Sequence, residues 1–352
     1  MSKPMQAVAE LDTRLTTFIE QHAQDTFYYH RAWLALISRL YGYTTIALTT
    51  TGSDGQYTGF LPLSFLQSPL TGRRLVALPF SDHAPLLATD EAVAGELVER
   101  AIRLAQERKA KYLELRTGLH PVLAAHPGLM ESNLYVSWLL PLAADPQVVW
   151  SGLRKPVQRQ IKKSQGHGVK VRFAQNLADI RHFYHLHLQT RGKKHGMPAQ
   201  PFLFFSELWR TFAPVGAMQL LLAEYEGRVI ASMVLLASGS TLRYAYGASD
   251  EGYLHLSPNN LLMWEAISWG CTHGYQRLDL GRTSCDNEGL MEFKRRWGAT
   301  QQPLPYYYYP RTAGLAATSE KSWMFRLLTG CWKRLPLQIA GPLGGRLYKH
   351  LG

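Results

Sequence analysis

The sequence has few cysteines and no long apolar run. Its three cysteines, Cys271, Cys285 and Cys331, are scattered over 352 residues. Such thiols are too few for a disulfide framework or a cysteine zinc site, and their number fits a reducing cytoplasm. No window reaches the roughly 18 uninterrupted apolar residues that span a bilayer. The N-terminal residues also lack a signal-peptide core, so we expect a cytoplasmic protein.

Acidic residues are scarce as well, with 26 Asp and Glu against 38 Lys and Arg and a formal net charge of +12. The excess is localised. Residues 151–172 contain seven cations and no acid, and residues 311–352 contain seven cations against Glu320 alone. A localised basic surface favours a polyanionic partner such as phosphate, nucleic acid or acidic lipid.

What is present is typical of a globular chain, 46% hydrophobic and 18% charged, with room for two domains of roughly 100–200 residues. Apolar alternation and turn signals predict strands and helices at residues 44–51, 56–66, 73–80, 91–109, 112–116, 120–125 and 134–140. The same order recurs roughly 165–175 residues later. We therefore predict an α/β fold of two similar mixed-sheet domains, residues 1–145 and 146–310, followed by a basic segment, 311–352.

Five segments together resemble a known family. They read PFSDHAPL (79–86), VQRQIKKSQGHGVKV (157–171), YGASDEGYLHLSPNNLLMWEAI (246–267), LDLGR (278–282) and FKRRWGA (293–299). With the repeated order of elements, they resemble the Gcn5-related N-acyltransferase (GNAT) fold in tandem. They are similar to the Fem peptidyl transferases, and closest to the FemAB-like or BioF-like acyltransferases found with exopolysaccharide gene clusters.

The resemblance implies two tandem GNAT-like folds and transfer of an acyl or aminoacyl group to an amine of a peptidoglycan-related or exopolysaccharide-related precursor. It implies no tightly bound cofactor, with acyl-CoA or aminoacyl-tRNA as donor. Acyl-CoA members usually carry a glycine-rich turn whose N–H groups hold the pyrophosphate. Residues 248–257 and 81–92, which fill that place here, lack the turn. The sequence therefore argues against a standard CoA cradle.

Three candidate catalytic residues lie between residues 275 and 298, which predict a strand, a glycine turn and a helix. Acyl transfer to an amine passes through an oxyanion, which a fixed cation stabilises by roughly 3–4 kcal/mol. Lys294 matches the lysine to which the Fem family assigns this role, and a surface lysine is the alternative. Arg282 suits a phosphate or carboxylate, or else a salt bridge to Asp279 or Glu292. Asp279 suits a base and a structural ion pair equally.

Further candidates suit substrate binding. Arg154 and Arg159 belong to a cationic row on a predicted helix, which suits phosphates or is merely a solvated face. Arg191 and His195 lie in a loop that suits an acceptor-side lid.

The remaining substrate-binding candidates lie in two of the motifs. Asp82 and His83 follow a strand and suit a site role, although neighbours on an extended segment usually point apart, so mutual activation is not expected. Tyr246 and Asn259 belong to the third motif. His182, His185 and His187 lack the geometry of a metal site, and we expect no metal.

Two alternatives concern partners. The expected partners are the donor and an amine-bearing envelope precursor, and no DNA. The aromatic and cationic residues of 311–352 suit a peripheral contact with an anionic inner-membrane surface, or else a segment packed across both domains. The alternative to an enzyme is a non-catalytic basic module that binds nucleic acid or anionic lipid.

Overall fold

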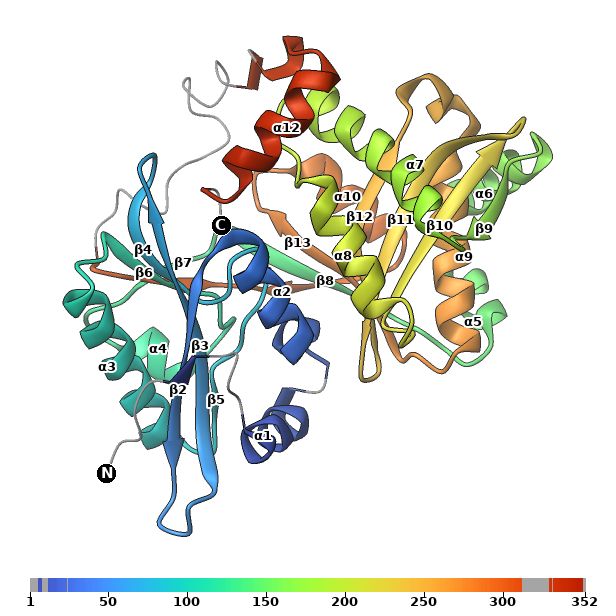
Figure 1. The fold of residues 1–352 in the computed structure, drawn as a ribbon. Helices are drawn as coiled ribbons and strands as arrows, with labels where there is room; N and C mark the ends of the chain where they lie inside the picture. The colour runs from blue at the N-terminus through green and yellow to red at the C-terminus, as the bar shows by residue number, and fades with distance from the viewer. Residues whose placement is uncertain (1–5, 8–11, 24, 312–328, 331, 351–352) are drawn as a thin grey trace.

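A computed structural model of the chain describes residues 6–7, 12–23, 25–311, 329–330 and 332–350. Two mixed sheets stand side by side, each covered by helices (Figure 1). No helix of the described residues is long and apolar enough to cross a membrane. The aromatic and cationic residues expected between 312 and 328, and Cys331, lie outside the described residues.

The predicted strands and helices of the N-terminal half are present, and helices before residue 42 were not predicted. The strand predicted at 73–80 ends at Val76, because Leu78 and Phe80 have φ angles of 48° and 63°, which lie outside the β region. The elements are β1 (Gln6–Ala7), α1 (Thr13–Ala23), the 3-10 helix η2 (Phe27–Tyr29), α2 (Arg31–Tyr41), β2 (Thr44–Thr51), β3 (Tyr57–Ser68), β4 (Gly72–Val76), β5 (Leu87–Ala88), α3 (Glu91–Glu107), β6 (Tyr112–Leu115), α4 (Pro121–Ala125), β7 (Met130–Ser132) and β8 (Tyr135–Pro141).

The C-terminal half repeats the order. Asn176 caps α7, since its side-chain oxygen accepts from the N–H groups of Ala178 and Asp179. Ser257 precedes α9 but does not cap it through its side chain, because this residue has φ 58° and its hydroxyl donates to Gln160. The elements are α5 (Pro146–Gly152), α6 (Lys155–Gly166), β9 (Lys170–Phe173), α7 (Leu177–Leu188), the π-helix η3 (Gln189–Lys194), α8 (Phe202–Phe212), β10 (Met218–Tyr225), β11 (Arg228–Ser238), β12 (Thr241–Ser249), the 3-10 helix η4 (Glu251–Leu256), α9 (Pro258–Thr272), β13 (Arg277–Ser284), α10 (Glu288–Arg296), β14 (Thr300–Pro303), β15 (Tyr306–Tyr309) and α12 (Leu337–Tyr348).

The two halves exchange strands. β8 pairs with β13 and β14, while β15 pairs with β6 and β7 of the first sheet (Figure 1). The expectation that the strand at 134–140 lies in the sheet of domain 1–145 was therefore wrong, and β15, within the predicted domain 146–310, joins the other sheet. Leu304 and Pro305 separate β14 from β15, and alternation along a strand specifies its faces but not its neighbours. The division at residues 145–146 stays a prediction.

One hydrophobic core joins the halves. Along β10, Leu220 and Leu222 belong to a cluster that continues through α7 and α8 into the N-terminal half, where it includes Trp33. Leu221 and Ala223 point the other way, into a cluster with α9. Because strand residues alternate between faces, the C-terminal sheet is buried on both sides, and its α8 side is continuous with the other half.

The second sheet opens beside β13. β12 and β13 pair in parallel only where residues 241–243 face 277–279. Beyond that point β12 continues along β11, while β13 continues along β8 after a register shift between Asp279 and Arg282. Gly281 lies within this shift with φ 73°, a conformation that glycine adopts without strain. Residues from both halves gather at this opening.

Candidate active site at the junction of the two halves

Arg243 of β12 joins the halves at the opening. One terminal nitrogen of its guanidinium donates to Asp82, which follows β4, and the other donates to Asp279 of β13. Only 11% of the Arg243 side chain is exposed, and the guanidinium lies 4.9 Å from the ring centroid of Tyr28. Burial alone would raise the pKa of Asp82, but Arg243 and Arg282 lower it to about 2. Asp82 is therefore ionised at neutral pH.

Arg282 binds the same carboxylate. Its Nε lies 3.3 Å from Asp82 Oδ1, and its backbone N–H donates to Asp82 Oδ2 at 3.2 Å. Its Nη1 donates to the Tyr306 hydroxyl at 2.7 Å, and that hydroxyl donates to the Asp82 carbonyl at 2.6 Å. The expected salt bridge of Arg282 to Asp279 or Glu292 was therefore wrong, since its carboxylate partner is Asp82. Asp82 and the exchanged strand β15 hold Arg282.

Gly281 permits this close approach. Its N–H donates to Asp279 Oδ1 at 2.7 Å. A Cβ at this position would lie 3.2 Å from Asp82 Oδ2, and the left-handed backbone would also disfavour any other residue. The turn therefore depends on glycine.

Lys294 of α10 is buried, with 4% of the residue exposed, so the surface-lysine alternative is wrong. Its Nζ donates to the carbonyls of Gly281 and Arg282, at 2.9 and 3.1 Å, and to Thr283 Oγ1 at 2.7 Å. A lysine ammonium has three donors, so all are engaged. Burial lowers its pKa to about 8. When protonated and bonded to these three acceptors, Lys294 fixes the backbone that carries Arg282.

His83 engages a different partner from Asp82, as expected for neighbours. Its Nε2 lies 3.0 Å from the Thr117 carbonyl. Because a carbonyl only accepts, Nε2 carries the proton and Nδ1 is left as an acceptor. Burial lowers the pKa of His83, so the ring is neutral at pH 7. A neutral imidazole with a free acceptor is suited to take up a proton.

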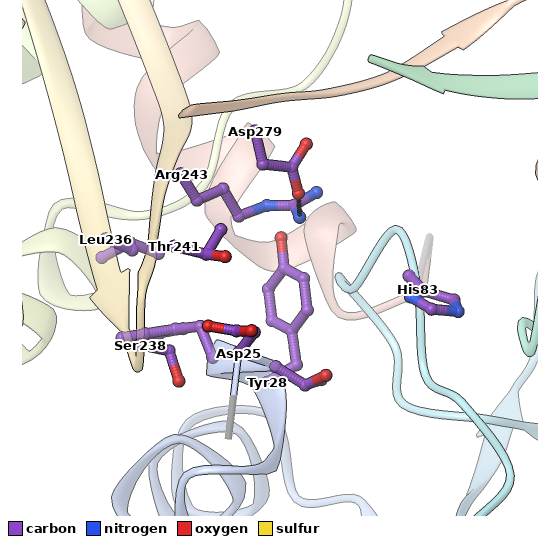
Figure 2. A pocket seen from close by; sticks show the side chains of 10 residues that line it. Asp25, Tyr28, His83, Leu236, Ser238, Thr241, Arg243 and Asp279 are labelled. Atoms are coloured by element: carbon purple, nitrogen blue, oxygen red, sulfur yellow. Dashed lines mark hydrogen bonds and ion pairs between the residues drawn. The ribbon is translucent and has the colours of Figure 1, made fainter. Parts of the chain in front are cut away.

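A small polar cavity of about 60 Å³ lies beside this junction. Figure 2 shows the Tyr28 ring standing between the Arg243–Asp279 pair and Asp25, with the hydroxyl toward Arg243. Thr241 is 7% exposed, and its Oγ1 has no hydrogen-bond partner among the described residues. Since one water needs roughly 10–15 Å³ of such space, a small polar group such as an amine fits. The walls are Asp25, Thr26, Phe27, Tyr28, His83, Leu236, Ser238, Thr241, Arg243 and Asp279.

The other predicted residues lie away from the junction. Arg154, which precedes α6, and Arg159 on α6 are exposed, and α6 lies at the far side of the C-terminal half (Figure 1). Arg154 lies 3.4 Å from Glu292 of α10. Arg191 and His195 lie in and after η3, where Arg191 donates to the Pro198 carbonyl at 3.3 Å. Their binding roles stay predictions.

Two residues of the third motif have structural partners. Tyr246 packs against Phe204 and Phe205 at centroid distances of 6.0 and 5.2 Å. Asn259 lies in the first turn of α9 and donates to Ser249 Oγ at 3.4 Å. Substrate binding by either stays a prediction.

Sequence reasoning missed Arg243, Tyr28, Thr241 and Tyr306. One signal was present, since Arg243 is the only charged residue in the strand TLRYAYGAS, and a charge within a buried strand requires a partner. Among the histidines considered for metal, His187 bonds Gln200 at 2.9 Å, and burial lowers its pKa to about 3. Within the described ranges no group of three His, Cys, Asp or Glu residues could hold a metal ion.

Parts of the sequence match known proteins. An acetyltransferase (GNAT) domain model matches residues 151–295. The chain is 33% identical over 82 residues to a lipid II:glycine glycyltransferase of Staphylococcus epidermidis, which covers 22% of this chain and 20% of that protein. It is 24% identical over 137 residues to a UDP-N-acetylmuramoylpentapeptide-lysine N(6)-alanyltransferase of Weissella viridescens, covering 38% and 40%. The matches thus span about a fifth and two fifths of these relatives.

The fold extends the likeness to both halves. The crystal structure of FemX matches with a TM-score of 0.66 at 16% identity, covering 87% of this chain and 97% of that chain. At this identity the likeness shows the fold alone. The resemblance and the tandem GNAT fold expected from the sequence are confirmed. In sequence over part of its length, and in fold over both halves, the chain is similar to FemAB-like proteins of the GNAT superfamily.

Proposed function

We propose that the protein is an N-acyltransferase that moves an acyl or aminoacyl group to an amine of a cell-envelope precursor. The observation that carries the proposal is the Asp82–Arg243–Asp279 junction, placed where β12 and β13 separate within a GNAT fold. The names of both relatives support it, since one is a glycyltransferase for lipid II and the other an alanyltransferase for a lysine N(6) amine. An exopolysaccharide-related precursor is the alternative acceptor, and the cytoplasm the proposed location.

In the proposed reaction the acceptor amine enters the cavity beside His83 and Thr241. The amine nitrogen attacks the donor carbonyl, forming a C–N bond, and its proton passes to His83 Nδ1. The tetrahedral intermediate then collapses, breaking the C–O bond of an aminoacyl ester or the C–S bond of a thioester. The leaving oxygen or sulfur takes a proton, which His83 can return.

The three catalytic candidates have distinct proposed roles. Asp279 accepts from both Arg243 and the Gly281 N–H, which favours the ion-pair alternative over the base. Arg282 supplies positive charge at the opening for the developing oxyanion or a donor phosphate. Lys294 holds the backbone at 281–283, and it donates to the carbonyl oxygen when the substrate replaces one of its present acceptors.

The turn before α9 favours aminoacyl-tRNA over acyl-CoA as donor. In place of a glycine cradle, Asp250 Oδ1 accepts from the Gly252 N–H at 3.0 Å, and Asp250 Oδ2 pairs with Arg228 at 3.1 Å. A carboxylate there repels a pyrophosphate. Helix α6 adjoins this turn through the bond of Ser257 to Gln160, and its exposed cations suit a larger polyanion.

A donor screen tests the proposal. The purified protein is incubated with lipid II or UDP-N-acetylmuramoylpentapeptide and with labelled acetyl-CoA, acyl carrier protein or charged tRNA. We expect labelled product with charged tRNA. Two results together would favour the non-catalytic basic module: no product from any donor, and binding of tRNA that Lys155→Glu with Arg159→Glu abolishes. The observation that supports this alternative is the set of exposed cations on α6.

Replacing His83 by asparagine is expected to lower kcat by about 10²–10⁴-fold, the range for loss of a general base. Asparagine can still donate to Thr117 but cannot take up the proton. Since burial places the pKa of His83 below its ordinary value, about 6.5, the wild-type rate should fall only as the pH drops below 6.5. That acid limb should be absent from His83→Asn. A variant that keeps the wild-type rate and limb would exclude His83 as the base.

A further inference from the structure

Helix α12 presents small residues to the protein and large apolar residues to solvent. Ala340, Gly341 and Gly344 are buried, whereas Ile339 and Leu343 are 53% and 38% exposed. An ordinary surface helix shows the opposite pattern, with its apolar side chains inward. Exposed apolar residues grouped on one face mark an interaction site.

The small face of α12 holds this orientation. A Cβ on Gly344 would lie 3.1 Å from the Ala199 backbone nitrogen, and one on Gly345 would lie 3.0 Å from Pro201 Cβ. The backbone of α12 therefore touches the segment before α8. Larger residues at these positions would not fit, so the helix cannot turn Ile339 and Leu343 inward without being lifted away.

Both ends of the segment are also tied down. Lys193 donates to the carbonyls of Lys333 and Leu335, at 3.2 and 2.8 Å, before the helix. After it, Arg74 donates to the His350 carbonyl at 3.0 Å, and Tyr348 stacks on Phe80 at 4.8 Å. For residues 332–350, packing across both halves is thus confirmed, and α12 lies over the top of the molecule in Figure 1.

Cations surround the exposed apolar residues. Lys333 and Arg334 precede the helix, Arg346 and Lys349 lie at its end, and all four are exposed. Residues 329–350 contain no Asp or Glu. An apolar centre flanked by the four cations of its own segment complements an anionic lipid surface, where apolar side chains enter the boundary of the headgroups and cations meet phosphates.

We propose that the α12 face, made of Ile339, Pro342, Leu343 and the four surrounding cations, docks the protein on an anionic phospholipid bilayer. A nucleic acid would need the cations but not the apolar residues, and a protein partner would not require a rim of one sign. Tyr348 packs on Phe80, two residues before Asp82, so docking brings the junction close to the membrane surface. The docking does not depend on the proposed reaction.

The test is sedimentation of the full chain with two kinds of vesicle. One contains phosphatidylcholine alone, and in the other phosphatidylglycerol makes up about a third of the lipid, which models an anionic leaflet. We expect binding only to the anionic vesicles, weakening with salt. Ile339→Ser with Leu343→Ser should lower the partition coefficient at least about tenfold. Lys333→Gln and Arg346→Gln should each lower it about fivefold. Val215→Ser, at a site 68% exposed before β10, should change nothing.

Each other outcome overturns the proposal. In the first, the wild-type protein does not bind the vesicles. In the second, the charge variants abolish binding but Ile339→Ser with Leu343→Ser leaves it unchanged. In the third, the wild-type protein is a dimer that Ile339→Ser with Leu343→Ser dissociates. The second outcome would indicate a simple polyanion site, and the third a contact between copies. Circular dichroism checks that the variants fold. Transfer to a water-soluble acceptor should be the same in all of them, so failure of docking is distinguishable from failure of the proposed reaction.

Discussion

Arg243→Met is expected to lower the free energy of unfolding by about 3–5 kcal/mol, the range for removing one partner of a buried ion pair. The substitution keeps the length of the side chain but leaves Asp82 and Asp279, 27% and 16% exposed, without the cation that joins them. Urea unfolding at pH 7 measures the loss. Transfer activity should also disappear, because Arg243 with Asp82 and Asp279, here called the clamp, sets the positions of both halves at the junction.

A second interhalf ion pair provides the matched control. Arg39 of α2 lies 2.6 Å from Glu207 of α8, but the Arg39 side chain is 65% exposed. Arg39→Met should therefore cost at most about 1 kcal/mol. Arg243→Lys should fall between the two, because an ammonium cannot bridge both carboxylates with a planar fork. Stability of Arg243→Met within 1 kcal/mol of wild type would contradict a structural role for the clamp.

The clamp also gives stability a pH dependence with a definite sign. Arg243 and Arg282 hold the folded pKa of Asp82 at about 2 against the burial that would raise it, and the ordinary value is about 3.9. The contribution of Asp82 to stability is therefore fully present above pH 4 or so and is lost as the pH falls toward 2. The wild-type protein should have a higher free energy of unfolding than Arg243→Met at neutral pH. The part of this difference that comes from Asp82 should shrink as the pH falls toward 2.

Lys294→Met is expected to lower kcat/KM by about 10²–10³-fold, the loss typical of removing one donor to an oxyanion. It releases the Gly281 and Arg282 carbonyls and Thr283 Oγ1. Arg296→Met is the matched control on α10, since Arg296 is exposed and its pairing with Glu292 at 3.0 Å lies on the surface. That variant should keep the wild-type rate. Equal rates for both variants would remove Lys294 from the mechanism.

The same lysine predicts an alkaline limb in the rate. Burial lowers the pKa of Lys294 to about 8, so above that pH the amine keeps only two of its three donors. The rate should fall through pH 8 or so, and in Lys294→Arg the limb should move above pH 10 or so, because a guanidinium does not deprotonate. Since the unfolded chain holds this proton up to about pH 10.4, the Lys294 contribution to stability rises over this interval. Deprotonation of Lys294 therefore does not unfold the protein over this interval, and unfolding would not explain the fall in rate.

The sequence predicted which residues gather at the junction better than it predicted the contacts among them. Asp82, His83, Asp279, Arg282 and Lys294 were all candidates, and the structure brings them to one junction. Their partners could not be predicted, because local patterns do not report contacts between distant segments. Arg282 was expected to pair near itself, yet its carboxylate partner is 200 residues away. Arg243 was missed for the same reason.

The fold shows the same division. Periodicity predicted α4 and β2 to within a residue at both ends, because one buried face per element is a local property. The exchange of β8 and β15 escaped prediction, since either sheet offers an edge that accepts their apolar faces. The left-handed residues Leu78 and Phe80, which end β4 early and direct the chain toward Asp82, also carry no glycine signal.

Amide hydrogen exchange of the wild-type protein, with and without the donor and acceptor that support transfer in the screen, tests the central claim most directly. If the amine and the acyl carbonyl meet where the two halves join, both substrates together should slow exchange in residues 79–84, 241–245 and 277–284. Slower exchange confined to α6, with the junction unchanged, would contradict the assignment and leave a basic surface without an active site.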